Sequence, residues 1–252
     1  MRPVEADRTD GNQGGQDHRR PLHWLSGTMA DVSIHCINLD GCPDDGRFLT
    51  VLDAGERQRL ERFRTPLLRR RFAARRWALR TLLARVRGVT AEAIALDSEP
   101  LGRPRLRDGH GPHFSTSHSG GMALIAWSDQ PLGVDIEVLS VDGNAHPASL
   151  FAPEEQRWLA QHPDHPAFLS LWTAKESYLK ARGLGLSEDL TLSAVIPDGA
   201  GAQLLRPGDA DRAWIIDRFS APGWIASCCH RPGSLLARVA PDDTLALLAS
   251  GS

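Results

Sequence analysis

Lysine is nearly absent from this chain of 252 residues, which has 29 lysines and arginines in total. Only Lys175 and Lys180 are lysines, so 29 − 2 = 27 of these cations are arginines. Arginine is a planar fork that stays charged, whereas lysine is a compact point charge on a flexible stem. Two lysines so close together in an arginine-rich chain indicate a site whose function requires lysine rather than arginine.

Other absences exclude whole classes of protein. No apolar run reaches the roughly 18 residues that a transmembrane helix needs, and the chain does not open with the apolar segment of a secretory signal. The four cysteines are Cys36, Cys42, Cys228 and Cys229, with no CxxC pair, so we expect buried thiols in a reducing cytoplasm. The two loose histidine pairs, His110 with His113 and His162 with His165, have no neighbouring cysteine and no HExxH helix, so a zinc site is not predicted.

Charge is balanced overall but unevenly distributed. The net charge is −2, yet twelve arginines and a single acid, Glu61, lie between Arg57 and Arg87. Such a patch predicts an anionic partner, and a nucleic-acid- or nucleotide-binding module is one alternative. The net charge and the lack of a recognisable DNA- or RNA-binding motif oppose that alternative. A different Mg²⁺-dependent nucleotide enzyme is disfavoured because the chain has neither GxxxxGK nor GxGxxG.

The two lysines lie in a predicted helix. Phe168, Trp172 and Leu179 recur at the spacing of one buried helix face, and Glu176 falls on that same face. A buried carboxylate is costly unless a cation or hydrogen bonds meet it, and Lys180 lies four residues on. The alternative is an exposed Glu–Lys pair, worth only about 0.2–0.5 kcal/mol.

A second acidic pair lies in a predicted strand over residues 132–138. Alternation directs Asp135 and Glu137 to one face, while the apolar residues between them pack into a core. Such close carboxylates repel each other unless a cation lies between them. Together with Glu176 they form an oxygen-ligand set suited to Mg²⁺. The alternative for the pair alone is an ordinary solvent-facing strand edge.

These segments carry a resemblance to a known family. Residues 133–137 (GVDIE), followed by residues 172–180 (WTAKESYLK), resemble the signature pair of the 4′-phosphopantetheinyl transferases. The chain length and residues 114–119 (FSTSHS) resemble the large monomeric Sfp-type branch. The resemblance runs from about Gly55 to Ser187, and the combined pattern is far more specific than either half.

The resemblance implies a role for each matching residue. It implies that Asp135, Glu137 and Glu176 hold Mg²⁺, with Mn²⁺ as a substitute, and that Glu176 and Lys180 are catalytic. The residues that it implies for coenzyme A binding are Arg59, Arg103, Ser117, His118, Lys175 and Lys180. Arg103 stands where the family has the lysine of a Gly-Lys-Pro segment. A second basic position of the family falls near Glu56, a departure for which Arg57 or the cluster Arg69–Arg71 would compensate.

The fold class that we predict is α+β. A helix is expected over Leu67–Val86, ended by Gly88, and another from about Ala167 to Gly183. The family fold implies two similar α/β halves with the active site between them. We therefore expect a disordered tail over 1–28, an N-terminal half over 29–128 and a C-terminal half over 129–252 that carries the metal site. Residues from Pro241 onward are expected to be peripheral.

The resemblance also implies a reaction. The 4′-phosphopantetheine arm of coenzyme A would pass to a serine of an apo acyl or peptidyl carrier protein, releasing adenosine 3′,5′-bisphosphate. This is the holo-[acyl-carrier-protein] synthase type of reaction, with coenzyme A as co-substrate. The carrier protein would dock on a basic rim that includes Arg182. We expect a cytoplasmic monomer that binds neither membrane nor nucleic acid.

Overall fold

The computed structural model describes residues 32–42, 46–99, 102–139, 150–184, 190–205 and 214–249. The expected tail over 1–28 lies outside these ranges, and so do residues 185–187 at the end of the family resemblance. The helices are α1 (Arg47–Thr50), α2 (Ala54–Glu61), α3 (Pro66–Arg87), α4 (Pro153–Gln161), α5 (His165–Arg182) and α6 (Pro241–Ala249), with the 3₁₀ helix η1 (Ala91–Ala93). The strands are β1 (Val32–Asn38), β2 (Leu96–Ser98), β3 (Pro104–Leu106), β4 (His113–Ser119), β5 (Met122–Ser128), β6 (Gly133–Val138), β7 (Ala194–Asp198), β8 (Gly201–Leu205), β9 (Ile215–Ala221), β10 (Trp224–His230) and β11 (Leu236–Val239).

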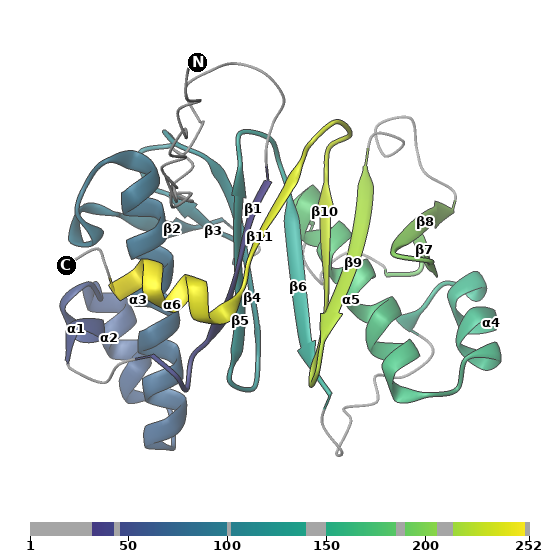
Figure 1. Cartoon of the computed structure of the whole chain (residues 1–252), viewed down its shortest axis with the longest axis horizontal. Helices are drawn as coiled ribbons and strands as arrows, with labels where there is room; N and C mark the ends of the chain where they lie inside the picture. Colours follow the sequence, from purple (N-terminus) through teal and green to yellow (C-terminus); the bar gives the residue numbers. More distant parts are fainter. Residues whose placement is uncertain are drawn as a thin grey trace, which may run out of the picture.

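Two sheets lie next to each other at the centre of the molecule, with helices on their outer sides (Figure 1). The first sheet has the order β11-β1-β5-β4 and the second has the order β6-β10-β9-β8-β7. Apolar residues from both sheets form one core between them: Val32, Ile34, Cys36, Leu124, Ala126, Leu132, Val134, Ile136, Ala226 and Cys228. The layer order is therefore helix, sheet, sheet, helix, and the predicted α+β class is confirmed.

The long helix α3 covers the outer face of the first sheet. Thr65 begins it by accepting a hydrogen bond from the backbone N–H of Leu68, and Pro66 occupies its first turn. Gly88 ends it in the left-handed conformation at φ 66°, as the sequence predicts. The side chains that α3 buries against this sheet include Trp77, Leu79 and Leu82.

The helix α5 is the centre of the second unit. Asp164 caps its start through the N–H of Ala167, and Gly183 ends it at φ 74°. The helix packs on β6 and β10 on one side and on β7 and α4 on another. It is consequently buried at nearly every position from Leu169 to Ala181, and not along one face only. Among the residues that the structure describes, no helix is long and apolar enough to cross a membrane.

The end of the chain corrects the expected division at residue 128/129. Strand β11 pairs in parallel with β1, with Val32 opposite Leu236, so it belongs to the first sheet. Helix α6 then packs against β1 and α3, and Leu248 is buried in the core between α3 and that sheet. The physical reason is that β1 would otherwise present an unpaired edge. Residues 241–249 are thus part of the first unit and are not peripheral.

A buried histidine in β1 makes the stability dependent on pH. His35 is 4% exposed, stacks on Trp127 at 4.5 Å between ring centroids, and its Nδ1 has no hydrogen-bond partner among the described residues. Burial lowers the pKa of His35 from 6.5 to about 4. The unfolded chain therefore binds more protons than the folded protein between these values, and stability is lost as the pH falls from 6.5 toward 4.

We expect this histidine alone to cost about 3 kcal/mol of unfolding free energy at pH 4 relative to pH 7. Urea unfolding of the wild type and of His35→Leu at several pH values measures it. The slope of unfolding free energy against pH should be shallower in the variant. Equal slopes in the two proteins would contradict the prediction. His118 titrates in the same window and keeps the slope of the variant above zero.

Candidate active site

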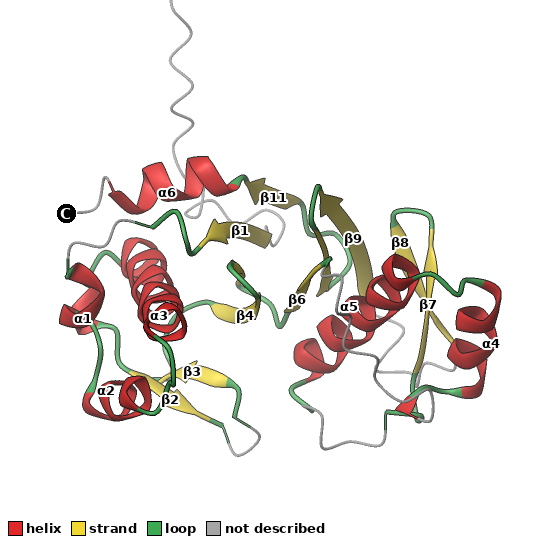
Figure 2. Ribbon diagram, turned by 90° about the horizontal axis from the view of Figure 1, so that it is seen from below, coloured by secondary structure: helices red, strands yellow, loops and turns green. Residues whose placement is uncertain are grey.

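The candidate site lies where the two sheets meet. Strands β4 and β6 are edge strands of different sheets and lie against each other (Figure 2). Side chains of β4 join them: the hydroxyl of Ser115 accepts the N–H of Val134, and that of Ser119 accepts the N–H of Val138, each at 3.1 Å. Alternation along β4 directs Ser117 to the same side. We call this line of three serines the serine seam.

Asp135 lies at the middle of the serine seam and is 4% exposed. Its Oδ1 accepts a hydrogen bond from Ser117 Oγ and another from Lys180 Nζ, both at 2.6 Å. Its Oδ2 is buried and has no hydrogen-bond partner among the described residues. An orphaned buried carboxylate oxygen is costly, and it is the kind of atom that a cation or ligand completes.

Two further carboxylates surround the same lysine. Glu176 Oε2 lies 3.9 Å from Lys180 Nζ, and Glu176 Oε1 is buried without a partner among the described residues. Burial raises the pKa of Glu176 to about 7; Lys180 opposes the shift, while Asp135 and Glu137 add to it. Burial also raises the pKa of Glu137, against the hydrogen bond that its Oε2 accepts from Ser119 at 2.6 Å. The structure thus brings together the predicted acids and one predicted lysine.

These carboxylates fit a hard, oxygen-binding cation in their chemistry. All donors are carboxylate oxygens, and two of them, on Asp135 and Glu176, are buried and unpartnered in the described part of the chain. A single lysine faces three acids, so a divalent cation would relieve their mutual repulsion. As the side chains stand, no three His, Cys, Asp or Glu groups within the described ranges converge as a ready-made metal site. The acids are instead oriented by Ser117, Ser119 and Lys180.

A cationic cavity of about 710 Å³ opens beside this cluster. Its lining includes Arg59, Arg75, Phe72 and His118, from α2, α3 and β4. The guanidinium groups of Arg59 and Arg75 lie over the Phe72 ring, 5.6 and 5.8 Å from its centroid, and the structure gives neither a carboxylate partner among the described residues. The pKa of Arg75 is lowered to about 10, mainly by burial and then by the charges of Arg76 and Arg59. The pKa of His118 is lowered to about 4, mainly by burial and then by the charge of Arg75. Such a cavity suits an anion.

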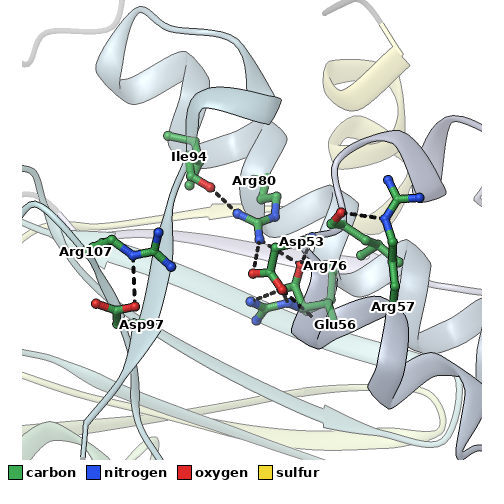
Figure 3. Close-up of polar contacts among 9 residues, drawn as sticks. Asp53, Glu56, Arg57, Arg76, Arg80, Ile94, Asp97 and Arg107 are labelled. Carbon is green, nitrogen blue, oxygen red and sulfur yellow. Dashed lines mark hydrogen bonds and ion pairs between the residues drawn. The ribbon is translucent and has the colours of Figure 1, made fainter.

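Glu56, where the family has a basic residue, is used inside the protein (Figure 3). Arg80 donates to Glu56 Oε2 at 2.7 Å, and Arg76 donates to Oε1. The Glu56 carboxylate also accepts the N–H of Asp53, which caps α2. Arg57 donates to the carbonyl of Leu52, so this expected substitute does not line the cavity. The acid thus neutralises two arginines of α3 and fixes α2 beside the cavity.

The Arg69–Arg71 cluster is not at the cavity either. Arg69 donates to the Phe63 carbonyl, Arg70 to the Asp40 carbonyl and Arg71 to the Asp40 carboxylate. Much of the arginine-rich stretch is therefore engaged by the protein itself. The arginine that does line the cavity without a carboxylate partner, in addition to Arg59, is Arg75. The sequence analysis did not predict a role for Arg75. Its position three residues after Phe72, on the buried side of α3, could have indicated one.

Arg103 lines a different cavity. Its Nη2 donates to the Leu132 carbonyl at 3.4 Å, and its side chain lines a cavity of about 370 Å³ together with Arg105 and Arg182. Only its neighbours Gly102 and Pro104 line the larger cavity. The segment 102–104 therefore directs the Arg103 cation away from Arg59 and His118.

Lys175 is not brought to the acidic cluster, in contrast to the expectation. It is 1% exposed, and its Nζ donates to both oxygens of Glu155, at 2.8 and 2.7 Å, and to the Ser193 carbonyl at 2.7 Å. Glu155 is itself fully buried. The physical reason is helix geometry: adjacent residues point about 100° apart, so Lys175 and Glu176 cannot face the same neighbour.

Comparison with known proteins gives consistent matches. The family model of the 4′-phosphopantetheinyl transferase superfamily matches residues 131–229. A putative 4′-phosphopantetheinyl transferase of Synechocystis sp. is 35% identical over 171 residues, which cover 62% of this chain and 68% of that protein. The 4′-phosphopantetheinyl transferase Sfp of Bacillus subtilis is 30% identical over 194 residues, covering 75% and 87%. The corresponding psf-1 protein of Bacillus pumilus is 28% identical over 184 residues, covering 71% and 79%.

Proposed function

The chain belongs to the 4′-phosphopantetheinyl transferase superfamily, and from this premise we propose that it modifies carrier proteins. It transfers the 4′-phosphopantetheine arm of coenzyme A to a serine of an apo acyl or peptidyl carrier protein. Adenosine 3′,5′-bisphosphate is released, as in the holo-[acyl-carrier-protein] synthase type of reaction. The observation that carries the proposal is the buried acidic cluster around Lys180, beside a cavity in which Arg59 and Arg75 have no carboxylate partner among the described residues.

The cavity suits the nucleotide end of coenzyme A. Arg59 and Arg75 supply permanent positive charge for its phosphates, and the Phe72 ring between them offers an apolar surface. With its pKa near 4, His118 is neutral at pH 7 and contributes a hydrogen bond rather than a charge. Arg103 and Lys175 are left out of this coenzyme site because their cations are directed elsewhere.

Asp135, Glu137 and Glu176 would hold Mg²⁺, with Mn²⁺ as a substitute. When bound, the cation would neutralise charge on the pyrophosphate of the coenzyme. The ammonium of Lys180, held by Asp135 at 2.6 Å, adds a mobile positive charge at the same place. Ser117 keeps the Asp135 carboxylate in position through the other hydrogen bond on Oδ1.

The chemical step is a displacement at the phosphorus that carries the pantetheine arm. The carrier serine oxygen forms a bond to this phosphorus, and the bond from phosphorus to the departing adenosine bisphosphate breaks. The serine proton must leave as the new bond forms. Glu176 is the acceptor that we assign, through an oxygen that does not hold the cation, because its carboxylate faces the same cluster as Lys180.

Features of the same structure support the proposed setting of the reaction. The acids and the cavity come from one chain, which supports a monomer. The four cysteines are free and buried, which fits the cytoplasm. Nucleic-acid binding through the arginine-rich helix is not supported, because Arg69, Arg71, Arg76 and Arg80 are engaged within the protein.

The test is an intact-mass measurement of an apo carrier protein incubated with the protein, coenzyme A and Mg²⁺. We expect a mass gain of one phosphopantetheine arm, lost on addition of EDTA. Asp135→Ala should lower the rate by about 10²-fold or more, because it removes a carboxylate that faces both Lys180 and the proposed cation. Asp198→Ala is the matched control, since this exposed aspartate lines neither the cluster nor either of the two cavities. No mass gain with acyl and peptidyl carriers alike would refute the proposed function.

A further inference from the structure

The three serines of the serine seam have the same hydroxyl group but different hydrogen-bond partners. Ser115 accepts a backbone N–H of β6, and no carboxylate contact is recorded for it among the described residues. Ser117 donates to Asp135, and Ser119 both accepts the N–H of Val138 and donates to Glu137. All three come from β4 of the first sheet, whereas the groups that they contact come from β6 of the second. The seam thus joins the two sheets by side chains in place of a backbone ladder.

Ser119 has the most constrained hydroxyl of the three. A serine hydroxyl has one proton to donate. The Ser119 oxygen accepts a hydrogen bond from the N–H of Val138 at 3.1 Å, and this bond fixes the orientation of the hydroxyl. The proton is then directed at Glu137 Oε2, 2.6 Å away. A hydrogen bond to an ionised acceptor is short and about twice as strong as a neutral one. Oε1 of the same carboxylate takes no part in this bond and stays available.

We infer that Ser119 is a positioning residue for the proposed metal site, holding the Glu137 carboxylate of the second sheet from the first. The inference rests on the proposed function, in which Glu137 is a ligand. Glu137 lies at the half-buried end of β6. A glutamate side chain has several rotatable bonds, so holding its carboxylate in one position costs conformational entropy. Groups that orient metal ligands in this way typically contribute about 10- to 100-fold to metal affinity.

Ser119→Thr and Ser119→Val test this directly, because threonine and valine have nearly the same shape and differ in the hydroxyl. The readout is the dissociation constant of the full-length protein for Mn²⁺, by calorimetry or electron paramagnetic resonance, alongside thermal unfolding. We expect Ser119→Val to bind Mn²⁺ about 10- to 100-fold more weakly than Ser119→Thr. Ser119→Thr should stay within about threefold of the wild type, because the hydroxyl that orients the ligand is kept.

Ser115→Ala is the matched control within the same seam. It removes the same kind of bond to a β6 amide, so it should lower the unfolding temperature as Ser119→Val does, while leaving Mn²⁺ affinity unchanged. Equal Mn²⁺ affinities of Ser119→Thr and Ser119→Val would overturn the inference, as would an equal loss in Ser115→Ala. A wild type that binds no Mn²⁺ would overturn it as well. A wild type that binds Mn²⁺ but modifies no carrier would refute the proposed function, while the Thr and Val comparison still decides the role of Ser119.

Discussion

Replacing Lys175 with methionine will lower the free energy of unfolding by about 3–5 kcal/mol, the usual result of removing one partner of a buried ion pair. Glu155 has no exposed surface, and it also accepts the N–H groups of Val195 and Ala152 at 2.8 Å. The variant therefore leaves a fully buried carboxylate without its cation. Since folded domains are stable by about 5–15 kcal/mol, this is a large fraction of the total. Thermal and urea unfolding followed by circular dichroism measure it.

The other lysine provides the control, because Lys180→Met changes the same residue type in the same helix. Lys180 is 27% exposed on its side chain and contacts the site. Its loss should lower the unfolding free energy by less than the loss of Lys175, because Lys180 keeps contact with solvent although its partner Asp135 is buried, while transfer activity falls. Removing both charges in Lys175→Met/Glu155→Leu should restore part of the lost stability. A Lys175→Met protein as stable as the wild type would show that the pair contributes nothing.

Gly133→Ala will disturb both the fold and the site, because strand β6 touches helix α5 at this glycine. A Cβ at position 133 would lie 2.0 Å from the Ser177 carbonyl oxygen and 2.4 Å from the Ala181 nitrogen. Both are backbone atoms, so no side-chain rotation relieves the clash. Strand and helix must separate, and Asp135 moves with the strand two residues away. Overpacking typically costs about 1–3 kcal/mol, and this contact is more severe than most.

The expected loss of transfer rate is about 10²-fold, since a displacement of an ångström at a reacting centre has that effect. Unfolding temperature and the carrier mass assay measure the two consequences. Gly55→Ala serves as the control for stability, because a Cβ there meets only Asp53 Oδ1 at 3.4 Å. It is not a control for the rate, since Gly55 lines the proposed coenzyme cavity. Alanine there should be neutral or slightly stabilising. Wild-type stability and rate in Gly133→Ala would contradict the close approach of β6 and α5.

Local chemistry explains what could be predicted from the sequence. The caps and glycine ends of α3 and α5 are encoded within a few residues, and the alternation in β6 places Asp135 and Glu137 without knowledge of the fold. Glu176 follows from helix periodicity. The association of these three acids came from the family resemblance, because the sequence alone does not show that β6 and α5 touch.

The remainder depends on contacts between distant segments. Nothing near Lys175 indicates that Glu155, twenty residues earlier, is its partner. Arg75 and Arg76 both line the cavity, and because Glu56 engages Arg76, Arg75 is the one left there without a carboxylate partner among the described residues. The short strand β8 was not predicted, because it exists only through pairing with β7 and β9. Pairing partners and ion-pair partners are properties of the assembled fold.

The return of the chain to its first sheet has a consequence for biogenesis. Strand β1 begins at residue 32, but its parallel neighbour β11 begins at residue 236. A polypeptide leaving the ribosome must therefore carry an unfinished first sheet until the last strand and α6 have been made. Parallel pairing across such a sequence separation closes slowly. The unpaired edge of β1 is then the segment most exposed to wrong partners during synthesis. The first unit is thus completed only after the strands of the second have been made, and its N-terminal strands alone are not a self-contained folding fragment.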